Sequence, residues 1–372
     1  MRIAVTRERG VGERRVAISP EAAKVLVAAG HDVVVESGAG SAAGMDDADY
    51  GSAGATIAPD RAATIGSEGL VVSVQGPTDS DALAGFTEDH VVVGLLDPVW
   101  NPEAATSVAA TGATSYSLDL VPRSTRAQSM DVLSSTATVA GTQAVLTAAY
   151  RLPKLMPLMI TAAGTIPPAR LVVLGAGVAG LQAIATARRL GAVVEGFDIR
   201  EEALEQIRSV GAKSISVPPA EDGVDPAAHT QAALTPHLAE ADIVITAAQI
   251  PGRRSPILVT EAMVDAMKSG AMIIDLAAIR GGNCELTRAD EEVAHNGVSI
   301  LGPTDLASGS AFSASRMFAN NVVKLIELIV TDDGTINLDT DDDIIAAMLV
   351  TTGGQVVHPQ VIEAGGPQWP FS

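Results

Sequence analysis

A glycine-rich turn at residues 175–180 carries the clearest chemical signal in the chain. The apolar run Leu171–Leu174 leads directly into Gly-Ala-Gly-Val-Ala-Gly, and a helical pattern follows. Gly175 permits a tight turn, Gly177 lets a pyrophosphate approach the backbone, and Gly180 lets helix and strand pack closely. The N–H groups at the start of such a helix attract phosphates. The pattern predicts a dinucleotide site; the other interpretation is a tight strand–helix turn without a ligand.

An acidic residue at the end of the next apolar run strengthens this prediction. Asp198 lies about 20 residues beyond the glycines, where a carboxylate can accept hydrogen bonds from an adenosine ribose. The same charge would repel a 2′-phosphate, which favours NAD over NADP. Arg200 leaves the opposite preference open, because a guanidinium there could attract that phosphate.

Two further segments could contribute to a site. Residues 123–131 (Arg-Ser-Thr-Arg-Ala-Gln-Ser-Met-Asp) place two cations, an amide and a carboxylate between the predicted domains. This segment is equally readable as a helix entry capped by Ser129 or Asp131. Residues 281–285 (Gly-Gly-Asn-Cys-Glu) follow a predicted strand end, and such ends face the ligand in doubly wound sheets. Cys284, the only cysteine, is interpreted as a small packed hydrophobe rather than a nucleophile.

These segments belong to a chain that alternates short apolar runs with helical patterns. Strands are predicted at 3–5, 32–36, 70–74, 91–96 and 113–118, and again at 171–174, 193–197, 214–217, 243–246, 272–276 and 299–301. Long helices are predicted at 131–150 and 314–329, and a mobile loop at 218–229. The fold class is α/β, with two Rossmann-like domains whose parallel sheets are flanked by helices. The first domain is discontinuous (1–132 plus 311–372), and the second, at 133–310, binds the dinucleotide.

Composition excludes several classes of protein. The formal charge of −20, with five Lys and 19 Arg, argues against nucleic acid and anionic lipid as partners and is typical of salt-adapted proteins. One cysteine excludes an internal disulfide, and the six histidines show no metal-ligand spacing, so no metal site is predicted. Neither a signal peptide nor a membrane-spanning helix is recognisable. A cytoplasmic protein without direct membrane insertion is expected.

Several motifs together resemble the NAD(H)-binding component of proton-translocating nicotinamide nucleotide transhydrogenase. The resemblance rests on Arg-Ala-Gln-Ser-Met-Asp (126–131), on residues 161–170 and 175–187, and on Asp-Leu-Ala-Ala with Gly-Gly-Asn-Cys-Glu (275–285). It spans nearly the whole chain. The N-terminal stretch 13–20 is shared with alanine dehydrogenase, so it identifies only the superfamily.

The resemblance implies direct hydride transfer from NADH on this chain to NADP⁺ on a partner subunit, coupled to proton movement across the membrane, with Re/Si stereospecificity. It implies a homodimer that is active only with membrane-embedded and NADP-binding subunits, which hold it peripherally at the inner face of the plasma membrane. The implied catalytic residues are Arg123, Gln128 and Asp131. The implied NAD(H)-binding residues are Ser129, Ser134, Gly175, Gly177, Val178, Ala179, Gly180, Asp198, Ile199, Arg200, Gln249, Leu276 and Asn283.

Alanine dehydrogenase is the alternative, and its chemistry separates the two relatives. That family surrounds its keto acid with an Arg, a Lys, a His and an Asp. Arg15 could fill the first role, but the other three positions fall at Gln75, near Leu96-Asp97 and at Ile279. Without a general acid, the carbonyl oxygen has no proton source. A non-enzymatic NAD sensor is a third interpretation.

The chain also departs from the transhydrogenase pattern in two places. Loop 218–229 lacks the Tyr that commonly folds over the adenosine, and residues 304–310 differ in the segment after the last strand.

Overall fold

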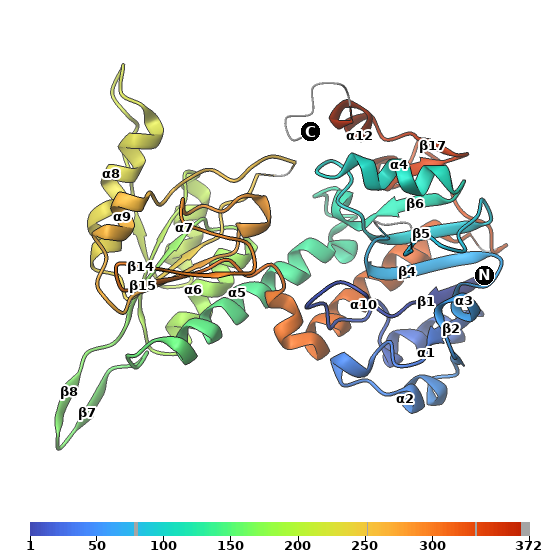
Figure 1. The fold of residues 1–372 in the computed structure, drawn as a ribbon, viewed down its shortest axis with the longest axis horizontal. Coiled ribbons are helices and arrows are strands. Elements are labelled where there is room, and N and C mark those ends of the chain that lie inside the picture. The colour runs from blue at the N-terminus through green and yellow to red at the C-terminus, as the bar shows by residue number, and fades with distance from the viewer. Residues whose placement is uncertain (78–80, 251, 332, 366–372) are drawn as a thin grey trace. The chain divides into compact units, whose positions relative to one another are not determined.

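The computed structural model describes residues 1–77, 81–250, 252–331 and 333–365 (Figure 1). The chain divides into two compact units, residues 1–136 with 308–372, and residues 137–307. Each unit is built around a mainly parallel sheet flanked by helices, as predicted for the fold class.

The first unit contains an eight-stranded sheet in the order β17-β16-β6-β5-β4-β1-β2-β3. The strands β1 to β6 run parallel, and β16 and β17 extend the sheet in antiparallel pairing. The strand bounds are β1 Arg2–Val5, β2 Asp32–Glu36, β3 Thr56–Ala58, β4 Gly69–Gln75, β5 His90–Leu95, β6 Thr114–Ser117, β16 Leu349–Thr352 and β17 Gln355–Val356. The helices are α1 Pro20–Ala28, α2 Asp47–Ser52, α3 Arg61–Ile65, α4 Pro102–Ala110, α10 Ala311–Ile329, α11 Asp343–Met348 and α12 Pro359–Ala364.

Buried aliphatic strands and an amphipathic helix form the core of this unit. Alternate residues of β4, such as Leu70 and Val72, pack with Phe318 and Val322 of α10 in one cluster. At the start of α1, Ser19 caps the helix by accepting a hydrogen bond from the Ala22 N–H, as the Ser-Pro-Glu sequence predicts. The core therefore joins strands from the N-terminal third of the chain to helices that follow residue 310.

The second unit contains a seven-stranded sheet in the order β11-β10-β9-β12-β13-β15-β14. All pairs are parallel except β14 with β15. The strand bounds are β9 Arg170–Leu174, β10 Val193–Phe197, β11 Lys213–Ile215, β12 Ile243–Thr246, β13 Met272–Asp275, β14 Glu292–His295 and β15 Val298–Leu301. The helices are α5 Val132–Arg151, whose first five residues belong to the first unit, α6 Val178–Arg189, α7 Glu201–Ser209, α8 Pro226–Ala239 and α9 Glu261–Asp265. The strand order reverses between β9 and β12, the point where such sheets bind ligands.

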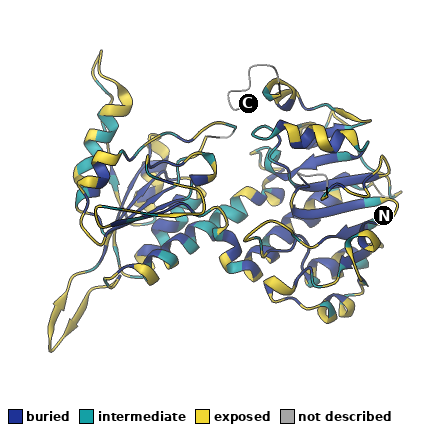
Figure 2. Ribbon diagram, in the orientation of Figure 1, coloured by how far each residue is buried: buried dark blue, intermediate teal, exposed yellow. Residues whose placement is uncertain are grey.

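A β-hairpin leaves the second unit after α5 and was not predicted. It consists of β7 Met159–Thr161 and β8 Gly164–Ile166, and every residue of both strands is exposed (Figure 2). Several exposed side chains near it are apolar, including Leu158 and Ile160. Prolines on either side hid these three-residue strands from the sequence pattern.

Two other predictions meet the structure directly. The loop predicted at 218–229 is shorter, because α8 begins at Pro226 with the Asp225 side chain accepting hydrogen bonds from the Ala227 and Ala228 N–H groups. This correction follows from an Asp-Pro helix start that the polar composition masked. Within the described ranges, no helix is both long and apolar enough to cross a membrane.

Candidate functional site

The glycine turn of the second unit contains two glycines that the fold requires and one that faces open space. Gly175 has φ +98°, and a Cβ there would lie 2.7 Å from the Ala248 nitrogen. A Cβ at Gly180 would lie 1.9 Å from the Gly175 carbonyl oxygen. A Cβ at Gly177 would meet no atom within 4 Å. The fold itself therefore requires Gly175 and Gly180, whereas the missing side chain of Gly177 leaves room for something outside the chain.

The start of α6 presents unpaired backbone donors at this space. Gly177 is the N-cap, with an ordinary φ of −76° and no side-chain capping bond. The first bond of the helix runs from the Leu181 N–H to the Gly177 carbonyl. Within the described chain, the N–H groups of Val178, Ala179 and Gly180 have no acceptor. Free donors, the positive end of a helix dipole and open space suit an anion such as a pyrophosphate.

Asp198 lies beside the turn, but its carboxylate is already engaged by the chain. The side chain is 8% exposed, and Oδ2 accepts a hydrogen bond of 2.8 Å from the Ala176 N–H. Arg200 donates to both oxygens, from Nε to Oδ1 at 2.9 Å and from Nη2 to Oδ2 at 3.0 Å. Burial alone would raise the pKa of Asp198, but the donors from Arg200 and Ala176 outweigh it and lower that pKa. Asp198 therefore braces the glycine turn, and Arg200 covers the acceptors that a ribose would use.

Exposed apolar side chains follow the strands at the carboxyl edge of this sheet. Ile199 is 85% exposed immediately after Asp198, and Val178 is 43% exposed at the first turn of α6. Ile250 and Ile279, which follow β12 and β13, are also exposed. Each residue follows the carboxyl end of a parallel strand in the same sheet. Flat aromatic rings bind well against such apolar surface.

The segments after β12 and β13 are fastened to each other by residues predicted to belong to the site. Asn283 is fully buried, accepts from the Ala248 N–H and donates to the carbonyls of Ala248 and Pro256. Gln249 donates to the Leu276 carbonyl at 2.7 Å. The side chains of Asn283 and Gln249 thus hold this edge in shape.

Asp275, which sequence reasoning did not select as a site residue, also holds the backbone at this edge. It is fully buried and accepts hydrogen bonds from the N–H groups of Ala277, Asn283 and Cys284 and from the Thr287 hydroxyl. Burial raises the pKa of Cys284 to about 11, so this thiol is a packed side chain, as predicted, rather than a nucleophile.

The segment 123–131 lies in the first unit and forms a loop followed by the short helix η3 (Gln128–Met130). Asp131 caps α5, because its carboxylate accepts from the N–H of Ser134 at 2.8 Å and from its hydroxyl at 2.6 Å. Arg123 and Gln128 are exposed, and within the described residues no hydrogen bond or ion pair engages either side chain. Both are free to contact a ligand or partner.

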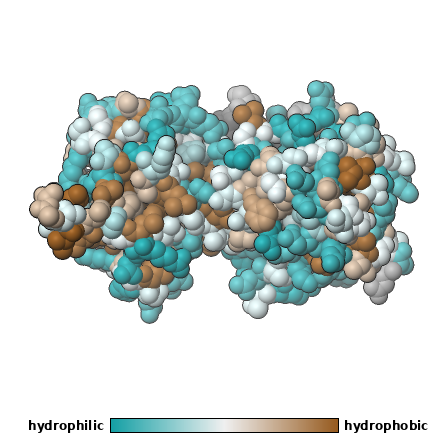
Figure 3. Space-filling view, turned by 90° about the horizontal axis from the view of Figure 1, so that it is seen from below, coloured by the Kyte–Doolittle hydropathy of each residue, from teal (hydrophilic) through white to brown (hydrophobic). Residues whose placement is uncertain are grey.

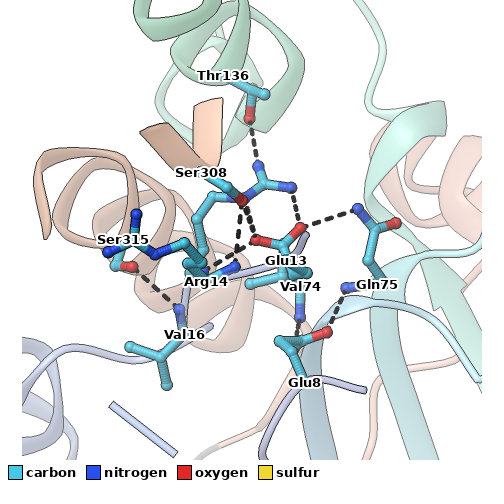
Figure 4. Close-up of polar contacts among 10 residues, drawn as sticks. Glu8, Glu13, Arg14, Val16, Val74, Gln75, Thr136, Ser308 and Ser315 are labelled. Atoms are coloured by element: carbon cyan, nitrogen blue, oxygen red, sulfur yellow. Dashed lines mark hydrogen bonds and ion pairs between the residues drawn. The ribbon is translucent and has the colours of Figure 1, made fainter. Parts of the chain in front are cut away.

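The carboxyl edge of the first unit's sheet is filled by its own charged side chains (Figure 4). Arg15, which could bind a keto acid, is buried and donates to Glu13 from Nε at 2.8 Å and from Nη2 at 2.6 Å. Gln75 and Ser308 also donate to Glu13. Burial opposes ionisation of Glu13, but these donors, Arg15 above all, hold its pKa at about 2.

Two more carboxyl groups close this edge. Glu8 accepts hydrogen bonds from the N–H groups of Val74 and Gln75, and burial raises its pKa to about 7. Asp119 accepts from the Asp97 N–H and the Ser117 hydroxyl, and burial raises its pKa to about 6. Sequence reasoning missed Glu8 because its partners lie on a strand distant in the sequence, and it missed Asp119 because the sequence does not show that this carboxyl group is buried.

Comparison with known proteins places both units in one family. Residues 4–140 match the model of the alanine dehydrogenase/PNT N-terminal domain, and residues 144–359 match that of the C-terminal domain. The chain is 41% identical over 386 residues to an NAD(P) transhydrogenase subunit alpha of Rhodospirillum rubrum, covering 98% of this chain and 100% of the relative. It is 37% identical over 372 residues to the subunit of the same name in Rickettsia prowazekii, covering 96% of each.

Solved structures show the same order of similarity. The crystal structure of transhydrogenase from Sinorhizobium meliloti superposes with a TM-score of 0.89 at 44% identity, covering 96% of this chain and 100% of that one. An L-alanine dehydrogenase superposes with a TM-score of 0.83 at 28% identity, covering 98% and 99%.

Proposed function

The chain belongs to the alanine dehydrogenase/PNT family and, within it, to the NAD(P) transhydrogenase alpha subunits, and from this premise we propose that it is the NADH-binding subunit of a proton-translocating transhydrogenase. Hydride passes directly from NADH on this chain to NADP⁺ on a partner subunit, with Re/Si stereospecificity. The observation that carries the proposal is the open space at Gly177 in front of three unpaired N–H groups. It supports a bound pyrophosphate in a chain whose close relatives are named transhydrogenase.

The second unit supplies the grip on the coenzyme. The N–H groups of Val178, Ala179 and Gly180 bind the pyrophosphate, and Ile199 offers an apolar surface to the adenine. Asp198 accepts hydrogen bonds from the adenosine ribose once Arg200 releases it. Gln249 and Leu276 border the nicotinamide side, where Asn283 keeps the surrounding backbone in place.

The first unit supplies the groups that position the transfer. We assign Arg123, Asp131, Ser129 and Ser134 to holding the nicotinamide and its ribose, and Gln128 to the ribose of the partner's nucleotide. The nicotinamide ring itself supplies the hydride. The chain needs no general acid for this step, because no oxygen is protonated; its residues orient the ring and exclude water.

The partners follow from the same role. We propose that the chain transfers hydride only together with the NADP-binding subunit, and that the membrane-embedded subunits hold it at the cytoplasmic face of the plasma membrane and couple transfer to proton movement. The relatives are named as alpha subunits, which supports a multi-subunit assembly.

We also propose a homodimer. A lone two-stranded hairpin with every residue exposed is marginally stable in water, so β7–β8 requires a partner surface. Apolar side chains gather at the left of Figure 3, over the unit that contains this hairpin. Large exposed side chains of the same unit include Ile160 at 75% and Tyr150 at 91% exposure. Light scattering should report a dimer that Ile160→Asp dissociates and that the polar change Thr161→Ser leaves intact.

An amino-acid dehydrogenase is the less favoured function. Arg15 is occupied by Glu13, and Gln75, Leu96 and Ile279 stand where that chemistry places its Lys, His and Asp. No side chain at those three positions can protonate a carbonyl oxygen.

Calorimetric titration and a paired rate assay test the proposal. The purified chain should bind NADH and bind NADPH at least tenfold more weakly. Mixed with the NADP-binding component, it should support reduction of NADP⁺ by NADH. Gln128→Asn should slow this transfer with little change in the NADH dissociation constant, because Gln128 faces the partner's nucleotide.

Two results would contradict the proposal. Oxidation of NADH with pyruvate and ammonium by the chain alone would identify an amino-acid dehydrogenase. Tight NADH binding without any transfer to the NADP-binding component would identify a sensor.

The acidic composition supports adaptation to salt. With a formal charge of −20, self-repulsion destabilises the folded chain at low ionic strength, and counter-ions screen it. The melting temperature should rise as KCl is increased to molar concentrations, and a flat profile would argue against this adaptation.

A further inference from the structure

Loop 123–131 combines free side chains with a fixed backbone. Arg123 and Gln128 are exposed and unpaired within the described residues, whereas Ala127 and Met130 between and beyond them are buried in the core of the first unit. A loop whose only task was to enter α5 would not need its backbone secured at several points. The points that secure it come from the segment of the chain after residue 310.

The first anchor is Asn321 on α10. Its side chain is 9% exposed, and Nδ2 donates to the Ser129 carbonyl at 2.7 Å. Its Oδ1 accepts from the Ser135 hydroxyl at 2.7 Å. One amide therefore links the residue after Gln128 to the first turn of α5, on either side of Asp131. Because both bonds are partly buried and join uncharged groups, this anchor does not depend on salt.

The second anchor is an ion pair at the start of α11. Arg126 binds Asp342 through two parallel bonds of 2.6 Å and also contacts Asp343. Asp342 is at the same time the N-cap of α11 and accepts from the N–H groups of Ile344 and Ile345. Arg126 is half-exposed, so salt screens this anchor.

We propose that Asn321 and Asp342 are positioning residues that hold loop 123–131 in the conformation needed for hydride transfer. This inference rests on the proposed function. Neither residue contacts the coenzyme: both act through the backbone that carries Gln128 and Asp131. Asn321 holds the loop against α10, and Asp342 holds it against the start of α11 through Arg126. Transfer is sensitive to the position of both rings, so a small relaxation of the loop reduces the rate more than it reduces binding.

Paired variants test the inference. Asn321→Ala and Asn321→Asp both remove the donor to the Ser129 carbonyl, and the matched control is Asn320→Ala, an exposed neighbour on the same helix. Asp342→Asn removes the charge that binds Arg126 but keeps an oxygen to cap α11, and its control is the exposed Asp341→Asn. Each variant is measured for NADH affinity and for the rate of transfer to the NADP-binding component at saturating NADH.

We expect the Asn321 variants to transfer hydride about tenfold more slowly, with NADH dissociation constants within about twofold of the unsubstituted chain. Asp342→Asn should slow transfer about threefold at low salt, and the difference should shrink in molar KCl. Both controls should behave as the unsubstituted chain. Equal transfer rates in Asn321→Ala and Asn320→Ala would overturn the inference, as would a loss of NADH affinity as large as the loss of rate.

A readout independent of activity covers variants that destabilise the fold. Trypsin cleaves after Arg123 and Arg126, and opening of the loop exposes these bonds. Asn321→Ala should be cut there faster than Asn320→Ala, and unchanged cleavage would contradict the anchoring. An unsubstituted chain that transfers no hydride would overturn the proposed function itself, whereas normal transfer in every variant would overturn only the role of the anchors.

Discussion

The two sheets of this chain differ at the carboxyl ends of their parallel strands: polar groups are paired within the chain in the first unit, and some are left unpaired in the second. In the first unit, Glu8 caps the end of β4, and Glu13 neutralises Arg15. In the second unit, the N–H groups at the start of α6 have no acceptor within the described residues, and Gly177 opens onto empty space. Since both units have the same architecture, the fold does not decide which edge binds a ligand. The decision lies in whether the chain satisfies its own polar groups there.

The carboxyl edge of the second unit contains both satisfied and unsatisfied polar groups. Asp275 and Asn283 satisfy the backbone after β12 and β13, which fixes the shape of that edge. Among the described residues, the phosphate-binding turn keeps three unpaired N–H groups, and Arg200 covers the ribose-binding carboxylate beside it. Selective binding requires unpaired groups that are held in place by a fixed backbone around them.

Filling the open position should have the largest effect. Gly177→Ala fits the backbone, which has an ordinary φ of −76°, but its methyl group occupies the approach to the helix N-terminus. We expect NADH binding to weaken at least tenfold, which corresponds to about 1.4 kcal/mol or more, without a change in melting temperature. The control Gly51→Ala, in α2 of the first unit and also in open space, should leave binding unchanged. Equal affinity in both variants would place the ligand elsewhere.

The second largest effect on NADH binding is expected from Asp198, which holds the glycine turn. Asp198→Ala deletes both the ribose acceptor and the carboxylate that holds the Ala176 N–H. We expect NADH binding to weaken about tenfold and the melting temperature to fall by a few degrees. Glu195→Gln is the control, because Glu195 is a buried acid on β10, the strand that Asp198 follows, and it pairs with His237 and Lys213 instead. Unchanged NADH affinity in Asp198→Ala would remove this residue from the site.

Removing the arginine that pairs with Asp198 should have a smaller effect, and it should strengthen NADH binding instead of weakening it. Arg200→Ala removes the group that competes with the ribose, so NADH should bind about two- to fivefold more tightly, in line with the modest strength of exposed ion pairs. NADPH binding should weaken, because Asp198 then faces the 2′-phosphate without a neutralising partner. Arg208→Ala, an exposed arginine on α7, is the matched control. Weaker NADH binding in Arg200→Ala would mean that the guanidinium binds the coenzyme directly.

The smallest expected effect concerns Glu8, at the carboxyl edge of the first unit's sheet, and it affects stability alone. Because burial raises the pKa of Glu8 from 4.5 to about 7, the folded chain keeps a proton that the unfolded chain loses in this range. The unfolded state then binds fewer protons, so this group makes stability fall as pH rises from about 4.5 to about 7. In Glu8→Gln, thermal unfolding between pH 5 and 8 should show less of this decline, and NADH affinity should not change. A variant as pH-dependent as the unsubstituted chain would assign the decline to other groups.

The sequence predicted the elements whose signals are local. The run Leu171–Leu174 before the glycines, the Ser19-Pro20 helix start and the central buried strands all lie at or within two residues of their predicted bounds. The small strands β7 and β8 escaped prediction because only three residues support each one, between prolines. The start of α8 at Pro226 escaped because its first turn is polar.

The candidate site was predictable where chemistry depends on neighbours in sequence and obscure where it depends on packing. The glycine spacing indicated an open turn, but not that Arg200 pairs with Asp198, since the sequence allows either orientation of the guanidinium. Asn321 follows Ser129 by nearly two hundred residues, so no spacing could reveal their bond. Glu13 and Arg15 stand two residues apart, and only the structure shows that the pair is buried.

Isotope transfer tests the central claim most directly. The chain is mixed with the NADP-binding component and supplied with NADH carrying deuterium at the transferred position of the nicotinamide C4, and the NADPH formed is examined by mass spectrometry. Direct transfer predicts that the deuterium appears in NADPH at the rate of NADH oxidation, with none released to water. Deuterium that reaches the solvent, or NADH that is oxidised only when pyruvate and ammonium are present, would contradict the account.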